Sequence, residues 1–274
     1  MTVKNVNIPL PALVAELVGT FVLATVALTI GQPLLVGLVL IVLVFGLGSI
    51  SGGHFNPAVT FGLWSVKKVE AVKMGFYWVS QFIGGIFALF VSQLFKGEQT
   101  NISLASFSSF DPKIVGAELI GMAIFTFVII SVIQRKSSEG VQAAAIGLAL
   151  MTGLYVGGGL LNLAIQNVST GTKEAPRVTK VEGVIINPAI ALASTEKDSQ
   201  AALQQQLMGG EAKAEKKTPA SRFTLETTVG PLAGAALGAN LYMALAGVNP
   251  FAKKKTVATK VTTTVKKSSK KSKK

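Results

Sequence analysis

The chain has 274 residues, half of them hydrophobic and only 14% charged, a balance that excludes an ordinary soluble protein of this size. With no cysteine and a single histidine, it excludes disulfides, thiolate metal sites and histidine-rich metal sites, so we expect neither a metal nor a cofactor. The net charge of +13 does not predict a nucleic-acid partner, because ten lysines lie between Lys253 and the end and the rest carries only +3.

Six stretches are apolar enough and long enough to cross a membrane, which takes about 20 residues. They are 10–30, 33–50, 71–95, 113–133, 141–161 and 228–247. The first follows a short polar head without the pattern of a cleaved signal peptide, so we expect it to be a retained helix. The sequence therefore predicts an all-α integral membrane protein with six transmembrane helices.

The chain consists of two similar halves. Residues 15–19 read Ala-Glu-Leu-Val-Gly, residues 117–121 read Ala-Glu-Leu-Ile-Gly, and each half continues into a glycine-rich second helix. Each half then reaches the same tripeptide, Asn56-Pro57-Ala58 in the first and Asn187-Pro188-Ala189 in the second. Because each half has three crossings, the halves must be inverted relative to each other, and the function of such proteins lies near the midplane between the repeats.

The two Asn-Pro-Ala tripeptides predict the starts of two re-entrant half-helices. Asn is a preferred helix N-cap and Pro is favoured at the first helical position. Helix starts at mid-membrane depth are tolerated only where they are buried in protein or line a cavity. If the two starts meet there, their partial positive charges and the side-chain amides of Asn56 and Asn187 repel cations, orient a water or hydroxyl oxygen and interrupt a proton wire.

Two glutamates and one histidine also lie in or beside apolar segments. Glu16 and Glu118 are functional-site candidates by their depth, and a proton relay is one possibility. The other is that each accepts hydrogen bonds from the backbone of a half-helix loop, which the matching positions in both halves favour. His54, two residues before Asn56, is expected to brace the first loop, with pH sensing as the alternative.

The distribution of lysine and arginine orients the chain. With the N-terminus in the cytosol, the cytosolic segments sum to +14 and the other side to about +1. The short loops 66–73 and 134–139 follow the positive-inside rule, so both termini are predicted to be cytosolic. Two polar insertions, 162–183 and 195–226, and the glycosylation patterns at Asn101 and Asn167 then fall outside.

Together these features identify the chain as resembling the aquaporin, or major intrinsic protein, family. The resemblance covers about 10–194 and 228–247 and rests on both tripeptides, on Glu16 and Glu118, and on the Ser-Gly-Gly-His lead-in at 51–54. It implies six tilted helices plus two half-helices, a homotetramer with one pore per subunit, and passive passage of water, glycerol or other small neutral solutes.

The resemblance also implies a domain division. Residues 1–9 form a cytosolic N-terminus, and 10–247 form the channel domain, with repeats at about 10–95 and 113–247. Residues 248–274 form a basic cytosolic tail that we expect to be disordered. Each lysine near anionic lipid headgroups contributes about 1 kcal/mol of attraction, so such lipids are its expected contact.

The positions that set selectivity in the family depart from its pattern. Most relatives have an Arg directly after the second tripeptide, and here that residue is Ile190. By spacing, the other constriction positions are Val36, Leu154 and Val184, so all four are aliphatic. Such a ring has more room and no cationic barrier, but it also lacks the main hydrogen-bond donor and can lose water.

The sequence thus predicts a passive channel, with two alternatives. An inverted-repeat secondary transporter would need Glu16 or Glu118 to face the cavity. A weakly conducting or non-conducting protein with a contact or assembly role would have a sealed aliphatic ring and use the outer insertions. No enzyme is predicted, because the sequence offers no nucleophile–base pair and no metal cluster.

Overall fold

The computed structural model describes residues 8–96, 110–168, 176–196 and 220–252. Its helices are α1 (Leu10–Thr29), α2 (Pro33–Ser51), α3 (Pro57–Ser65), α4 (Ala71–Lys96), α5 (Pro112–Gln134), α6 (Glu139–Gln166), the 3-10 helix η1 (Arg177–Lys180), α7 (Pro188–Ala193) and α9 (Leu225–Leu245). Six of them are long and apolar enough to cross a membrane, at the places that the sequence predicts. The predicted all-α membrane fold is therefore confirmed.

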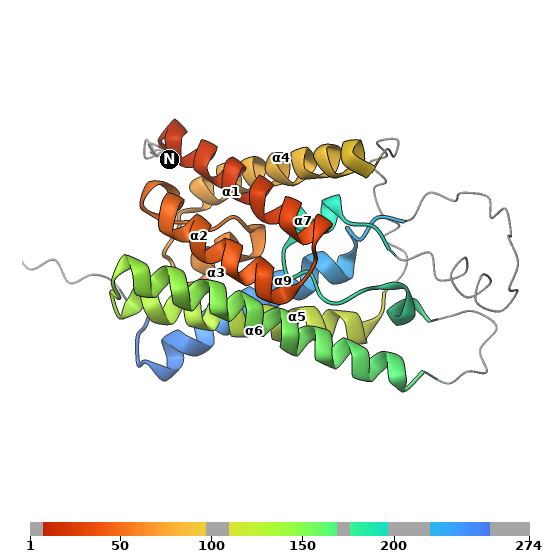
Figure 1. Ribbon diagram of the computed structural model, residues 1–274. Coiled ribbons are helices and arrows are strands. Elements are labelled where there is room, and N and C mark those ends of the chain that lie inside the picture. The colour runs from red at the N-terminus through yellow and green to blue at the C-terminus, as the bar shows by residue number, and fades with distance from the viewer. Residues whose placement is uncertain (1–7, 97–109, 169–175, 197–219, 253–274) are drawn as a thin grey trace, which may run out of the picture.

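The six long helices run side by side, and the two short helices lie between them (Figure 1). In the first half α1 packs on α2 and α4, and in the second half α5 packs on α6 and α9. The halves meet where α2 packs on α6, and each short helix also crosses to the other half, α3 onto α9 and α7 onto α4. The halves are thus interlocked, and the start of α1 and the end of α9 lie at the same end of the bundle.

Glycines allow the helices of the two halves to approach closely. A Cβ atom on Gly37 of α2 would lie 2.7 Å from the carbonyl oxygen of Gly147, and one on Gly147 of α6 would lie 2.4 Å from the carbonyl oxygen of Gly37. Small residues permit such close approach in lipid, where van der Waals packing rather than the hydrophobic effect holds helices together. This contact brings the two halves together.

Two helices extend several residues beyond a predicted bound. The last one begins at Leu225 rather than 228, because Thr224 caps it: its side chain accepts from the Thr227 amide, and the Thr227 side chain accepts in return from the Thr224 amide. Helix α6 continues to Gln166 rather than 161, since Leu163, Ala164 and Ile165 carry on its apolar character.

Several predicted features lie outside the described residues. They are the glycosylation pattern at Asn101, the middle of the insertion 195–226 and the tail from 253 onward. Asn167 is described and ends α6, and its side-chain amide donates to the carbonyl oxygen of Leu163 at 2.8 Å.

We predict that Gly147→Ala destabilises the protein by about 1–3 kcal/mol, because the added methyl group overpacks the α2–α6 contact. The control is Gly46→Ala on the same helix pair, since a Cβ atom at Gly46 would meet nothing within 4 Å. Unfolding midpoints in detergent measure both. Equal midpoints for the two variants would show that the close α2–α6 contact does not hold the halves together.

Candidate functional site

Each Asn of the two tripeptides caps its own short helix. Asn56 has extended backbone, with φ at −158°, and its side-chain oxygen accepts from the Ala58 amide at 2.8 Å. Asn187 repeats this geometry with φ at −145° and a bond of 3.1 Å from the Ala189 amide. The Pro that follows each Asn fills the first helical position, where no backbone N–H is needed. Asn56, Pro57, Ala58, Asn187, Pro188 and Ala189 are all buried.

The two tripeptides are also bonded to each other across the pseudo-symmetry axis. The Asn56 side-chain nitrogen donates to the carbonyl oxygen of Ile186 at 2.8 Å, and the Asn187 nitrogen donates to the carbonyl oxygen of Phe55 at 3.0 Å. A side-chain amide has two N–H groups. Each Asn therefore spends one N–H on the opposite loop and keeps a second one for another acceptor.

The residue before each Asn adopts an unusual backbone conformation. Phe55 has φ at 48° and Ile186 has φ at 47°, in the left-handed region that residues with a side chain rarely adopt. A β-branched residue such as Ile is a clear outlier there, and surrounding structure must hold it. Because the same positive φ occurs at matching places in both halves, it is a regular feature of the two loops that lead to the Asn-Pro-Ala tripeptides.

Glu16 holds the first loop. Its carboxylate accepts from the backbone amides of His54 and Phe55 at 3.0 and 2.8 Å. It also accepts from the Ser51 hydroxyl at 2.6 Å and from the Gln81 side-chain amide at 2.7 Å. The side chain is fully buried, and these four bonds offset the cost of removing a carboxylate from water.

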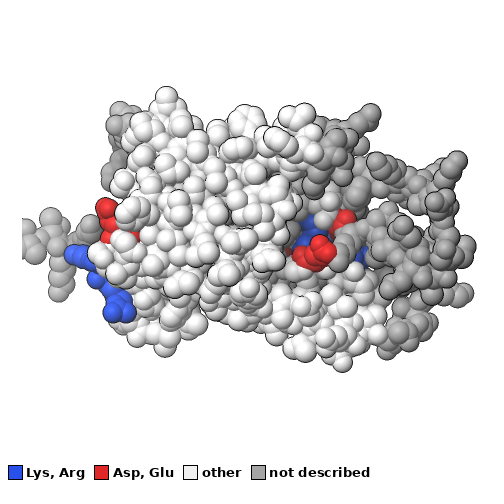
Figure 2. Space-filling model, viewed as in Figure 1, with Lys and Arg blue, Asp and Glu red and all other residues white. Residues whose placement is uncertain are grey.

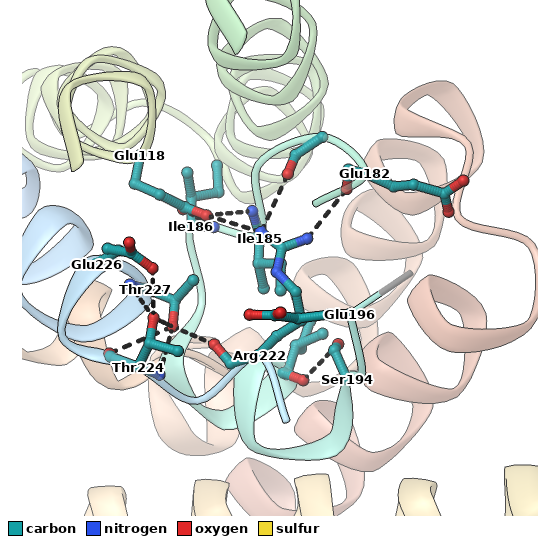
Figure 3. Close-up of polar contacts among 12 residues, drawn as sticks. Glu118, Glu182, Ile185, Ile186, Ser194, Glu196, Arg222, Thr224, Glu226 and Thr227 are labelled. Carbon is teal, nitrogen blue, oxygen red and sulfur yellow. Dashed lines mark hydrogen bonds and ion pairs between the residues drawn. The ribbon is translucent and has the colours of Figure 1, made fainter. Parts of the chain in front are cut away.

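Glu118 holds the second loop in the same way but with a different counterpart. It accepts from the backbone amides of Ile185 and Ile186 at 2.9 and 2.7 Å. In place of a neutral pair such as Ser51 and Gln81, it faces the guanidinium of Arg222, with 3.7 Å between Arg222 Nη2 and Glu118 Oε1 (Figure 3). The two halves therefore share the carboxylate brace and differ in its charge balance.

His54 is bonded within the first loop. Its Nδ1 lies 3.1 Å from the Thr60 hydroxyl, which donates in turn to the carbonyl oxygen of Asn56 at 3.0 Å. The imidazole ring packs edge-on against Tyr77, with 5.1 Å between ring centroids. These contacts make His54 a support for the backbone around Asn56.

A cavity of about 740 Å³ runs through this arrangement. Its wall includes His54, Asn56, Asn187 and Arg222, so it continues past both tripeptides to the first loop. The four positions that the sequence assigns to the outer constriction also line it: Val36, Leu154, Val184 and Ile190. In the described part of the chain, the lining includes neither Glu16 nor Glu118.

Arg222 is the residue that sequence reasoning missed. It falls within the insertion 195–226, which the sequence presents only as a polar connection. The structure pairs the two ends of that insertion: the Arg222 amide donates to the carbonyl oxygen of Ser194 at 2.8 Å, and the Glu196 amide donates to that of Ala220 at 2.7 Å. This pairing places Arg222 in the cavity wall. No local sequence motif predicts that position.

The sequence model of one family, described as major intrinsic protein, matches residues 29–168. Aquaporin Z of Photorhabdus laumondii subsp. laumondii is 37% identical over 167 residues, which cover 51% of this chain and 72% of that protein. Nodulin-26 of Glycine max is 34% identical over 170 residues, covering 56% of this chain and 63% of the relative.

A solved structure shows the same fold. The aquaglyceroporin from Plasmodium falciparum superposes with a TM-score of 0.52 over 86% of this chain and 94% of its own, at 20% identity. Among the sequence relatives the matched share is smaller in some cases: the similarity to aquaporin-8 of Rattus norvegicus, 30% identical over 138 residues, covers 47% of this chain and 52% of that protein.

We predict that Glu16→Gln loosens the first loop, because one amide N–H replaces an acceptor and leaves a buried backbone donor unpaired, at a cost of about 1–3 kcal/mol. The unfolding midpoint falls, and hydrogen exchange rises at the amides of His54 and Phe55. Glu70→Gln is the control, since Glu70 is exposed. Unchanged exchange in the Glu16 variant would show that the carboxylate does not hold the loop.

Proposed function

The chain belongs to the major intrinsic protein family, and we propose that it is a passive channel for water and small neutral solutes such as glycerol or urea. The observation that carries this proposal is the cavity that passes both Asn-Pro-Ala boxes and is lined by the two Asn side chains. The names of the relatives and of the solved structure support the same class of activity. The family is one of channels, and we propose no enzymatic activity for this chain.

The proposed mechanism uses the second N–H of each Asn side chain. Asn56 and Asn187 are fixed by one bond to their own helix and one to the opposite loop. The N–H that remains on each is then available to an oxygen atom of a water or hydroxyl in the cavity. A water molecule whose oxygen accepts from both Asn side chains must direct its own two O–H groups to the waters on either side. This orientation interrupts the chain of hydrogen bonds along which a proton would move.

The aliphatic ring of Val36, Leu154, Val184 and Ile190 is proposed to shape the outer constriction. Its side chains offer no hydrogen bonds, so a solute passing it must bring its own apolar surface or find polar groups nearby. This favours a neutral solute with both hydroxyl and hydrocarbon groups over an ion.

The placement of the two membrane glutamates argues against the transporter alternative. Glu16 and Glu118 are fully buried, and each is bonded to loop backbone rather than placed in the cavity wall. A coupling-ion site at either would require the loop to release it. The cavity of about 740 Å³ that the four aliphatic positions line likewise argues against a sealed ring in a protein used only for contact or assembly.

The chain is a multi-pass integral membrane protein. On the face shown in Figure 2 the middle of the bundle is free of charged side chains, which gather at its two ends.

We propose that both termini are cytosolic, that the chain forms a homotetramer and that the basic tail contacts anionic lipid. Protease access to the tail in sealed vesicles tests the orientation, native mass spectrometry counts the subunits, and flotation with anionic vesicles tests the tail.

The channel proposal predicts that proteoliposomes containing the chain swell faster than empty liposomes in stopped-flow gradients of water, glycerol or urea. The rates should rise linearly with the gradient, because a pore does not saturate as a carrier does. A pH difference across the membrane should not change them, because a passive pore is not coupled to protons. Leu154→Trp is the blocked control, since Leu154 is only half-buried and lines the cavity. No flux above empty liposomes for any of the three would refute the channel.

A further inference from the structure

The outer part of the cavity contains one buried cation whose role the fold alone does not explain. The Arg222 side chain is only 4% exposed, yet it lines the cavity beside Val184 and Ile190. Removing a guanidinium from water is costly unless it is paired and hydrogen-bonded. The contacts of the Arg222 guanidinium therefore indicate which interactions compensate for its burial and which of its donors remain free.

The guanidinium is fixed in place on one side. Its two terminal nitrogens donate to the carbonyl oxygens of Glu182 and Gly183, each at 3.1 Å, and one of them faces Glu118 at 3.7 Å. These carbonyls belong to the loop that leads to Asn187. Figure 3 shows the side chain reaching from the segment before α9 to this loop and to Glu118.

The guanidinium has five N–H groups, and these contacts do not use all of them. Among the described residues Arg222 Nε has no hydrogen-bond partner, although it is buried. The cavity wall also holds a buried acceptor without a partner, Oε1 of Gln93 on α4. Unpaired buried polar atoms cost about 1–3 kcal/mol each, so such atoms at a cavity wall point to a molecule that satisfies them.

We propose that Arg222 is the specificity-determining residue of the outer mouth and donates a hydrogen bond from its guanidinium to the oxygen of a passing neutral solute. The resemblance to the family leads one to expect an arginine at position 190, where Ile190 stands; the segment before α9 supplies a guanidinium to the same cavity instead. Solutes that both accept and donate hydrogen bonds, such as water and small polyols, suit Arg222 together with Gln93. This inference rests on the proposed channel function.

A second arginine provides a matched control. Arg177 lies on the same outer side, where its Nε donates to both carboxylate oxygens of Glu226 at 2.8 Å and its Nη1 pairs with Glu196. It is largely buried and charged like Arg222 but is not part of the cavity wall. Loss of Arg177 disturbs the ionic contacts on the outer side without changing the mouth.

The test compares Arg222→Gln with Arg177→Gln in proteoliposomes, with water and glycerol permeability measured on each. Glu118 keeps its bonds from the backbone amides of Ile185 and Ile186 in either variant, so the loop keeps its brace. The shorter, uncharged side chain leaves an aliphatic ring that hinders water more than glycerol and widens the mouth. We expect the glycerol-to-water ratio to rise about tenfold, which corresponds to one hydrogen bond, and to stay within about twofold for Arg177→Gln.

An unchanged ratio in Arg222→Gln, or an equal change in Arg177→Gln, would overturn the inference. Absence of flux in the unmodified chain would instead refute the channel itself, so the two failures are distinct. If Arg222→Gln does not fold, Arg222→Lys decides by the same ratio. Lys keeps the charge but lacks the planar guanidinium and its Nε, so the glycerol-to-water ratio should again rise. A ratio equal to that of the unmodified chain would overturn the assignment.

Discussion

Two reciprocal hydrogen bonds at the centre of the bundle set the geometry on which the other features depend. The side chain of Asn56 donates to the loop that precedes Asn187, and Asn187 donates to the loop that precedes Asn56. Each bond fixes the start of one short helix against the backbone of the other. The two helix starts must therefore stay in register. This keeps both Asn56 and Asn187 in the wall of the cavity.

These bonds require carbonyl oxygens that point toward the axis, and that requirement explains the strain and the buried charges nearby. Phe55 and Ile186 adopt positive φ values, and Glu16 and Glu118 hold their amides from behind. The packing agrees with this, because a Cβ atom on Gly19 would lie 2.2 Å from the Phe55 ring. In the second half a Cβ atom on Gly121 would lie 2.6 Å from the carbonyl oxygen of Gly153 and 3.3 Å from the Ile186 side chain. The halves differ in charge, because the guanidinium of Arg222 faces Glu118, whereas neutral groups surround Glu16, and Arg222 also lines the cavity.

The sequence predicted what depends on local pattern and on repetition. Apolar length predicted the six spans, the Asn-Pro pairs predicted the helix starts, and the matching positions of Glu16 and Glu118 favoured the two braces over a proton relay. The crossed bonds between the halves could not be predicted, because they join residues about 130 positions apart through backbone carbonyls, which have no sequence signature. Arg222 could not be predicted either, since its place depends on how the insertion 195–226 closes on itself. The early start of α9 was in principle visible in Thr224 and Thr227.

We propose that the paired Asn side chains hold the oxygen atom of a passing molecule and interrupt proton conduction. The most direct measurement records proton and water permeability in the same proteoliposomes, with a pH-sensitive dye for the first and swelling for the second. We expect water flux well above that of empty liposomes together with proton leakage no greater than theirs. Proton leakage that rises with the amount of reconstituted protein, in step with water flux, would contradict this proposal.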